Sequence, residues 1–195
     1  METGAERMRV ITGTARGRRL GELKGQETRP TTGKVKEGVF SALQFDIEGR
    51  RVLDLFAGTG QMGIEALSRG AKSCVFVDRR RDACQLVGDN LAVCGFTAQG
   101  QVVCADAMGY LNALRTQFDL IFLDPPYADD TLERAIAHIA RFDILAPYGI
   151  IVAECPADKA LPSLSAPYRV HREYRYGKIK VTVYRRDGEK KETEE

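Results

Sequence analysis

Two short motifs contain residue types that could do chemistry. The first, Gly58-Thr59-Gly60-Gln61-Met62-Gly63, matches the glycine pattern that lets a backbone turn tightly and approach a bound cofactor. An acid, Asp54, precedes it inside an apolar run. A carboxylate there suits a cationic ligand, such as the sulfonium amino acid S-adenosylmethionine, better than the pyrophosphate of a dinucleotide. The glycine pattern by itself permits either cofactor.

The second motif, Asp124-Pro125-Pro126-Tyr127, is the most specific signal in the sequence. Two prolines fix the backbone and remove two N–H donors, which leaves a carboxylate and a carbonyl oxygen as acceptors for an amino group. Such acceptors would restore lone-pair density to the exocyclic amine of a base, which is otherwise a poor nucleophile, and Tyr127 could stack on that base. The motif therefore predicts methyl transfer to a base amine. Orientation of the reactants and electrostatic stabilisation would supply most of the rate enhancement.

Two more acids follow predicted strands. Asp78 ends the run 73–78 and could accept hydrogen bonds from both ribose hydroxyls of a cofactor. Asp106 ends the run 101–106 and could accept the adenine amino group. For each acid the alternative is an N-cap of the helix that follows. Ligands of open parallel sheets bind outside the carboxyl ends of the strands, so these acids are expected at one edge.

The elements that must position these residues alternate regularly. Helical stretches at 61–69, 80–93, 107–115 and 130–142 separate apolar runs at 52–56, 73–78, 101–106, 118–124 and 149–155. This alternation predicts a parallel sheet with both faces covered. Period-two alternation over 168–186, around Gly177-Lys178, predicts an antiparallel pair at the sheet edge. A further helix is expected to start near Thr31 or Thr32.

The amino-terminal part of the chain is basic. From Arg7 to Lys36, nine Lys and Arg residues stand against two acids. Such an excess is typical of a protein whose partner has phosphate groups, although a solvated surface is the alternative. Residues 8–27, with glycines at 13, 17 and 21, are expected to form a two-stranded unit.

Composition narrows the class of protein. A chain of 195 residues with 44% hydrophobic content fits one domain with a substantial core. Its apolar runs are too short to span a bilayer, and METGAERMRV lacks the apolar core of a secretory signal, so a cytoplasmic monomer without membrane contact is expected. The five cysteines form no C-x-x-C pair, which predicts free thiols and no metal site.

Together these motifs resemble the RsmD-type methyltransferases, which make N2-methylguanine in bacterial small-subunit ribosomal RNA. The resemblance covers about residues 8–186 and rests on MRVITGTARGRRL, TRPT at 28–31, VLDLFAGTGQMGIEALSRGA, the DPPY at 124–127 and YGKIKVTVY. The chain departs from the family after TRPT, where TGKVKEG replaces a string similar to Asp-Arg-Val-Arg-Glu-Ala. Gly33 and Gly38 should weaken a helix there by about 1 kcal/mol each.

The resemblance implies an α/β, Rossmann-like class I methyltransferase fold. Its mostly parallel seven-stranded sheet would end in an antiparallel carboxy-terminal hairpin, with a small amino-terminal β-hairpin added. The implied limits are a basic, RNA-contacting extension at 1–30, a methyltransferase domain at 31–186 and a disordered tail at 187–195. The implied cofactor is S-adenosylmethionine, and the implied partner is small-subunit ribosomal RNA, free or within a partly or fully assembled subunit.

The resemblance also implies roles for individual residues. The implied catalytic residues are Asp124, Pro125, Pro126 and Tyr127. The residues implied to bind the cofactor are Asp54, Phe56, Ala57, Gly58, Gly60, Asp78, Arg79, Asp106 and Ala107. The residues implied to contact nucleic acid are Arg9, Arg16, Arg18, Arg19, Arg29, Thr31, Lys34 and Lys36.

Other functions remain open on these motifs. A DNA methyltransferase acting on adenine N6 or cytosine N4 would share the DPPY motif, although a short chain leaves little room for a module that reads DNA sequence. An NAD-dependent oxidoreductase fits the glycine pattern but leaves DPPY unexplained. A non-catalytic RNA-binding module is disfavoured by the four acids at the predicted strand ends.

Overall fold

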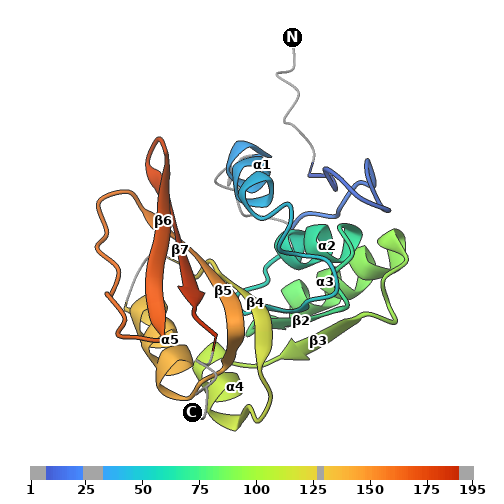
Figure 1. Ribbon diagram of the computed structural model, residues 1–195. Coiled ribbons are helices and arrows are strands. Elements are labelled where there is room, and N and C mark those ends of the chain that lie inside the picture. Colours follow the sequence, from blue (N-terminus) through green and yellow to red (C-terminus); the bar gives the residue numbers. More distant parts are fainter. Residues whose placement is uncertain (1–7, 24–32, 127–129, 189–195) are drawn as a thin grey trace, which may run out of the picture.

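A seven-stranded sheet in the order β3-β2-β1-β4-β5-β7-β6 forms the centre of the computed structural model, which describes residues 8–23, 33–126 and 130–188 (Figure 1). The strands are β1 Arg51–Asp54, β2 Ser73–Asp78, β3 Gly100–Cys104, β4 Phe118–Leu123, β5 Leu145–Pro156, β6 Tyr168–Tyr176 and β7 Ile179–Arg186. Strands β1 to β5 are parallel, and β7 is antiparallel to both β5 and β6. The predicted parallel sheet with an antiparallel edge hairpin is confirmed.

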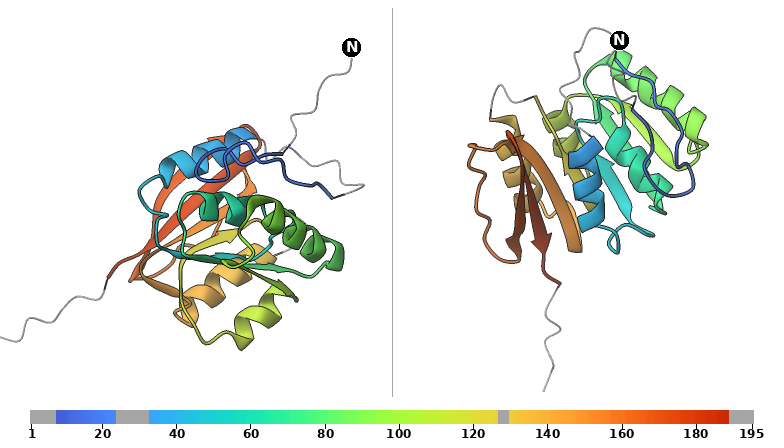
Figure 2. Two further views of the ribbon diagram at one scale, coloured as in Figure 1. Left: turned by 90° about the vertical axis from the view of Figure 1, so that its right-hand side faces the viewer. Right: turned by 90° about the horizontal axis from the view of Figure 1, so that it is seen from above.

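Helices cover both faces of this sheet (Figure 2). They are α1 Gly33–Ala42, α2 Gln61–Ser68, α3 Arg81–Cys94, α4 Ala107–Ala113 and α5 Thr131–Arg141. Successive side chains of a strand point to opposite faces, so Val52 packs in the core under α1 to α3 while Leu53 packs in the core over α4 and α5. Among the described residues, no helix has the length and apolarity needed to cross a membrane.

The order of the strands reverses between β1 and β4. The chain runs from β1 outward through β2 to β3 and then returns to place β4 on the other side of β1. Neighbouring parallel strands at such a switch point diverge into helices on opposite faces, which leaves a crevice at their carboxyl ends. The residues that follow β1 and β4, 55–60 and 124–126, therefore lie at the same edge of the sheet.

The predicted amino-terminal β-hairpin is not seen in the part of that segment that the structure describes, residues 8–23. Within residues 8–23, one isolated antiparallel bridge joins Arg9 and Arg19, and no regular strand forms. The backbone N–H groups of Ile11 and Thr12 donate instead to the Glu65 carboxylate of α2, at 2.8 and 2.9 Å. Because these two donors bind a side chain, the short backbone pairing between residues 8–10 and 17–20 does not extend into a strand ladder.

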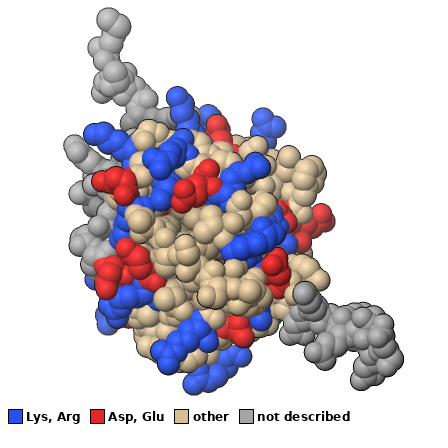
Figure 3. All heavy atoms as spheres, turned by 60° about the vertical axis from the view of Figure 1, so that its left-hand side comes forward, with Lys and Arg blue, Asp and Glu red and all other residues tan. Residues whose placement is uncertain are grey.

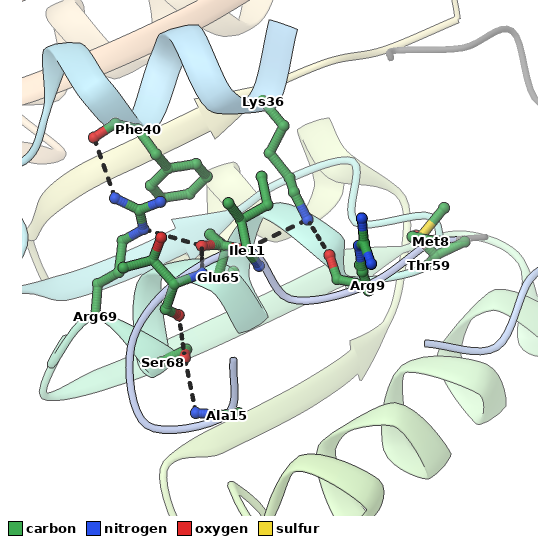
Figure 4. A network of polar contacts seen from close by, with 12 residues as sticks. Met8, Arg9, Ile11, Ala15, Lys36, Phe40, Thr59, Glu65, Ser68 and Arg69 are labelled. Carbon is green, nitrogen blue, oxygen red and sulfur yellow. Dashed lines mark hydrogen bonds and ion pairs between the residues drawn. The ribbon is translucent and has the colours of Figure 1, made fainter. Parts of the chain in front are cut away.

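Glu65 organises a buried polar network between this loop, α1 and α2 (Figure 4). Its side chain is fully buried, and Lys36 of α1 lies 3.4 Å from its carboxylate while Arg69 donates to it at 3.0 Å. Lys36 also donates to the Arg9 carbonyl at 2.8 Å. Burial lowers the pKa of Lys36, and the neighbouring Glu65 carboxylate opposes that shift. The network fixes the loop and α1 to the same helix.

Strand β6 forms one edge of the sheet, and charged side chains protect it. Arg169, Arg172 and Arg175 are exposed along β6. Figure 3 shows the side of the molecule with β6 and β7, where basic side chains are interspersed with acidic ones. Charged side chains on an edge strand disfavour pairing with a second sheet.

Gly38 explains how α1 can lie against the sheet despite a residue that weakens helices. A Cβ atom at Gly38 would lie 2.0 Å from the hydroxyl oxygen of Tyr176 on β6. The missing side chain therefore leaves room for the end of the Tyr176 ring against the helix. At this position the packing requirement outweighs the cost in helix propensity.

We predict that Gly38→Ala lowers the free energy of unfolding by about 1–3 kcal/mol, because Tyr176 must be displaced. Chemical denaturation measures the change. Gly88→Ala in α3 is the matched control, because a Cβ there meets nothing within 4 Å. It should stabilise the protein by up to about 1 kcal/mol through helix propensity alone. Stabilisation by both substitutions would contradict the close contact between α1 and β6.

Candidate active site

One pocket opens at the switch point of the sheet and contains residues from both sequence motifs. Asp54 and Phe56 line it from the end of β1, and Asp124 lines it from the end of β4. Glu154 of β5 supplies a third carboxylate. The remaining wall is largely apolar and is formed by Val39, Ala57, Met62, Phe122, Leu123, Val152 and Val181, with Gln61 as a polar member.

The glycine loop turns the chain from β1 into α2. Gly58 and Gly60 have φ values of 53° and 77°, in the left-handed region where a residue with a Cβ is strained. A Cβ at Gly58 would meet nothing within 4 Å, so the space beside this part of the loop is open. Asp78 supports the loop from β2, since one carboxylate oxygen accepts the Gly58 N–H at 2.9 Å and the other accepts the Arg80 N–H at 2.9 Å. Each oxygen retains acceptor capacity for a ligand.

Asp54 is a buried acid with an unusual affinity for its proton. It is 4% exposed, and its carboxylate accepts the Gly63 N–H at 3.0 Å. Burial raises the pKa of Asp54 to about 7; the Gly63 hydrogen bond opposes this shift, and the nearby Asp78 charge adds to it. A cation bound in the pocket would favour the ionised form.

Asp124 lies where the second motif predicts a reactive carboxylate. The residue has exposed surface, while the surrounding protein atoms desolvate its carboxyl group. This desolvation, followed by the charges of Glu154 and Asp54, raises the pKa of Asp124 well above its usual range. Pro125 is buried and Pro126 is exposed. Tyr127, the aromatic member of the motif, lies outside the described residues.

Asp106 is an exposed helix cap beside the second strand. Its carboxylate accepts the Gly109 N–H at 2.8 Å at the start of α4, which confirms the capping alternative. A hydrogen bond of 3.0 Å from the Ala105 N–H to the Asp78 carbonyl holds this turn next to the end of β2. Ala107 is buried as the first residue of α4, and Arg79 is exposed. Cofactor contacts of these residues stay predictions.

The basic residues predicted to contact nucleic acid divide into two groups. Arg9, Arg16, Arg18 and Arg19 on the loop 8–23 and Lys34 at the start of α1 are exposed. Lys36 is 3% exposed and bound to Glu65, so its prediction as a nucleic-acid contact is wrong. Its ammonium group is used inside the protein. Arg29 and Thr31 lie outside the described residues.

Glu154 is a pocket residue that the motif analysis missed. It is 7% exposed and stands in the apolar run 149–155, which contains no recognised motif. The available signal was the same one that singles out Asp54, an acid near the carboxyl end of an apolar strand. No glycine loop and no Asp-Pro-Pro motif accompanies Glu154, so the sequence alone does not distinguish it from an ordinary surface acid.

Comparisons with known proteins agree with this geometry. The family model described as "Conserved hypothetical protein 95" matches residues 8–185. "Putative rRNA methyltransferase YlbH" of Bacillus subtilis is 42% identical over 93% of this chain and 100% of its own length. "Ribosomal RNA small subunit methyltransferase D" of Escherichia coli is 33% identical over 96% of this chain and 94% of its own.

A solved structure extends this similarity to the whole fold. "Putative methyltransferase yhhF from Escherichia coli" superposes with a TM-score of 0.85 at 31% identity, covering 94% of this chain and 99% of its own. Both sequence and fold are therefore shared over nearly the full length. The chain belongs to the Conserved hypothetical protein 95 family and, with it, to the RsmD-type methyltransferases that its motifs resemble.

Proposed function

We propose that the protein transfers a methyl group from S-adenosylmethionine to the exocyclic N2 amine of a guanine in small-subunit ribosomal RNA. One observation carries this proposal: Asp54, which precedes the glycine loop, and Asp124 of the Asp-Pro-Pro-Tyr motif line a single pocket. A methyl donor held by the first strand end would thus lie next to an amine held by the second. The relatives named as ribosomal RNA methyltransferases support RNA as the substrate.

The residues around the glycine loop fit S-adenosylmethionine. Asp54 would bind the cationic amino acid end, and Asp78 would accept the ribose hydroxyls. The open space beside Gly58 leaves room for the ligand at the turn. The binding site of S-adenosylmethionine would also include Phe56, Ala57, Gly60 and Arg79. Asp106 and Ala107 would lie near its adenine. The cofactor supplies an electrophilic methyl group.

Asp124 and the Pro125 carbonyl would hold the two hydrogens of the target amine. As the bond from N2 to the methyl carbon forms, the bond from that carbon to sulfur breaks, and S-adenosylhomocysteine leaves. The nitrogen gains positive charge, which nearby carboxylates stabilise. The raised pKa of Asp124 suits it to take the surplus proton from that nitrogen.

The exposed arginines of loop 8–23 would contact the phosphates of the RNA. They lie on a loop that α2 holds through Glu65 and through Ser68, whose hydroxyl accepts the Ala15 N–H at 3.0 Å. A fixed loop can position the target strand by its backbone, while the pocket reads the base. A stacked or paired target base would have to be extruded into the pocket.

We predict that Asp124→Ala lowers kcat/KM for methyl transfer at least about 100-fold, while the Kd for S-adenosylmethionine changes by less than about tenfold. The reason is that Asp124 acts on the amine and not on the cofactor. Transfer of a labelled methyl group to purified small-subunit ribosomal RNA and to assembled small subunits measures the loss. Undiminished turnover would remove Asp124 from the proposed role.

The same assay, followed by mass spectrometry of the nucleosides, tests the substrate itself. N2-methylguanosine in small-subunit RNA is the expected product. N6-methyladenine or N4-methylcytosine in a DNA control would favour a DNA methyltransferase instead. Preferential binding of NAD over S-adenosylmethionine in calorimetry would contradict methyl transfer altogether.

We predict that affinity for S-adenosylmethionine increases as the pH rises through about 7. Below that pH Asp54 holds a proton, and the cationic ligand must displace it before the ion pair forms. Calorimetry in buffers of different ionisation enthalpy should therefore detect proton release on binding at mildly acidic pH. Asp54→Asn should bind more weakly and show no such release. An identical pH profile in that variant would assign the titration to another group.

We predict that simultaneous Arg16→Glu, Arg18→Glu and Arg19→Glu substitutions weaken RNA binding and make its salt dependence shallower. The slope should fall by about 0.7 to 0.9 for each phosphate contact that is lost. Equivalent charge reversals at Arg172, Arg175 and Lys178 on the β6–β7 hairpin are the matched control for net charge. An unchanged slope in the loop variant would show that these arginines form a solvated surface and do not contact the phosphates of the RNA.

A further inference from the structure

Glu154 and Asp124 are neighbours on adjacent parallel strands. Leu123 of β4 is the register partner of Ala153 of β5, so the next residue of each strand is an acid at the same level of the sheet. Neighbouring strands lie about 4.8 Å apart, which brings the two carboxyl groups within reach of one small ligand. Both residues line the pocket.

Apart from Asp124, the pocket residues next to Glu154 on the sheet are apolar. Glu154 shares the face of β5 with Val152, and its register partner across the sheet is Val181 of β7. Val39 of α1 and Val181 line the same pocket. A carboxylate at this place in the pocket can accept hydrogen bonds from a ligand that enters it.

The bases that have an exocyclic amine differ in the ring atom beside it. In guanine the amine at position 2 lies next to N1, which bears a hydrogen. In adenine and cytosine the ring nitrogen beside the amine bears a lone pair instead. An ionised carboxylate only accepts hydrogen bonds, so it attracts the guanine edge and repels the other two.

We propose that Glu154 determines specificity for guanine, by accepting the N1–H of the base whose N2 amine Asp124 holds. This inference rests on the proposed function and assigns the choice of base to a residue outside the known motifs. Asp124 would thus act on the reacting nitrogen, while Glu154 positions and selects the ring. A base with a lone pair at the N1 position would leave the buried carboxylate facing a second acceptor.

The electrostatic interaction between Asp124 and Glu154 agrees with these separate roles of the two residues. The charge of Glu154 is one cause of the raised pKa of Asp124. Two adjacent carboxylates are unfavourable when both are ionised, and a base that donates to each of them reduces that penalty. Guanine has donors for both on one edge.

A base analogue tests the inference without changing the protein. An RNA fragment containing the mapped target nucleotide is prepared with guanine or with 2-aminopurine, which keeps the amine at position 2 but has a lone pair at N1. At mildly alkaline pH the wild-type protein should methylate the 2-aminopurine fragment with a kcat/KM at least about 100-fold lower. Equal rates on both fragments would overturn the role of Glu154 and leave the proposed function intact. Failure on the guanine fragment and on assembled subunits would instead contradict the proposed function.

The variant Glu154→Gln tests the residue itself. A glutamine can donate to the N1 lone pair, so the preference for guanine over 2-aminopurine should shrink at least about tenfold. Glu173→Gln is the matched control, because Glu173 lies on β6 beside Lys180 and outside the pocket lining, and it should keep the wild-type ratio. Unchanged discrimination in an E154Q protein that melts and binds S-adenosylmethionine like the wild type would overturn the inference. If E154Q does not fold, the wild-type comparison of the two fragments decides.

Discussion

The parallel alignment of β1, β4 and β5 is the constraint on which the site depends. Parallel neighbours end at the same edge, so acids that are far apart in the sequence, Asp54, Asp124 and Glu154, line one pocket. Their proximity has an electrostatic cost, which the raised pKa values of Asp54 and Asp124 express. The fold tolerates this cost because hydrogen-bonded strands hold the acids in place. Ligands that bring a cation or N–H donors would relieve it.

The features that the sequence predicted are those encoded by short, local patterns. Apolar runs and helical periodicity predicted the order of the elements, and the rule that ligands bind at strand ends was enough to place Asp54 and Asp124 at one edge. Contacts between distant segments were not predictable in this way. The Glu65 carboxylate replaces a strand partner for Ile11 and Thr12, and no pattern within residues 8–27 indicates that replacement.

Lys36 and Glu154 both show that contacts between distant segments cannot be predicted from local sequence. A lysine in a basic segment was assigned to the surface, whereas its partner Glu65 lies far along the chain and draws it inside. An acid in an apolar strand passed unnoticed because its neighbour Asp124 lies on another strand. Charge in a sequence indicates what a residue can bind, while burial decides whether solvent, protein or ligand is the partner.

Helix α1 contacts three different parts of the fold through residues close together in its sequence. Lys36 binds α2, Gly38 admits the ring of Tyr176, and Val39 faces the pocket. Each residue of a helix advances the side chain by about 100°, so one residue inserted or deleted between Lys36 and Gly38 would turn Lys36 away from Glu65 if Gly38 and Val39 kept their partners. The spacing of Lys36, Gly38 and Val39 within α1 should therefore be kept during evolution, and natural changes in length should fall outside the helix.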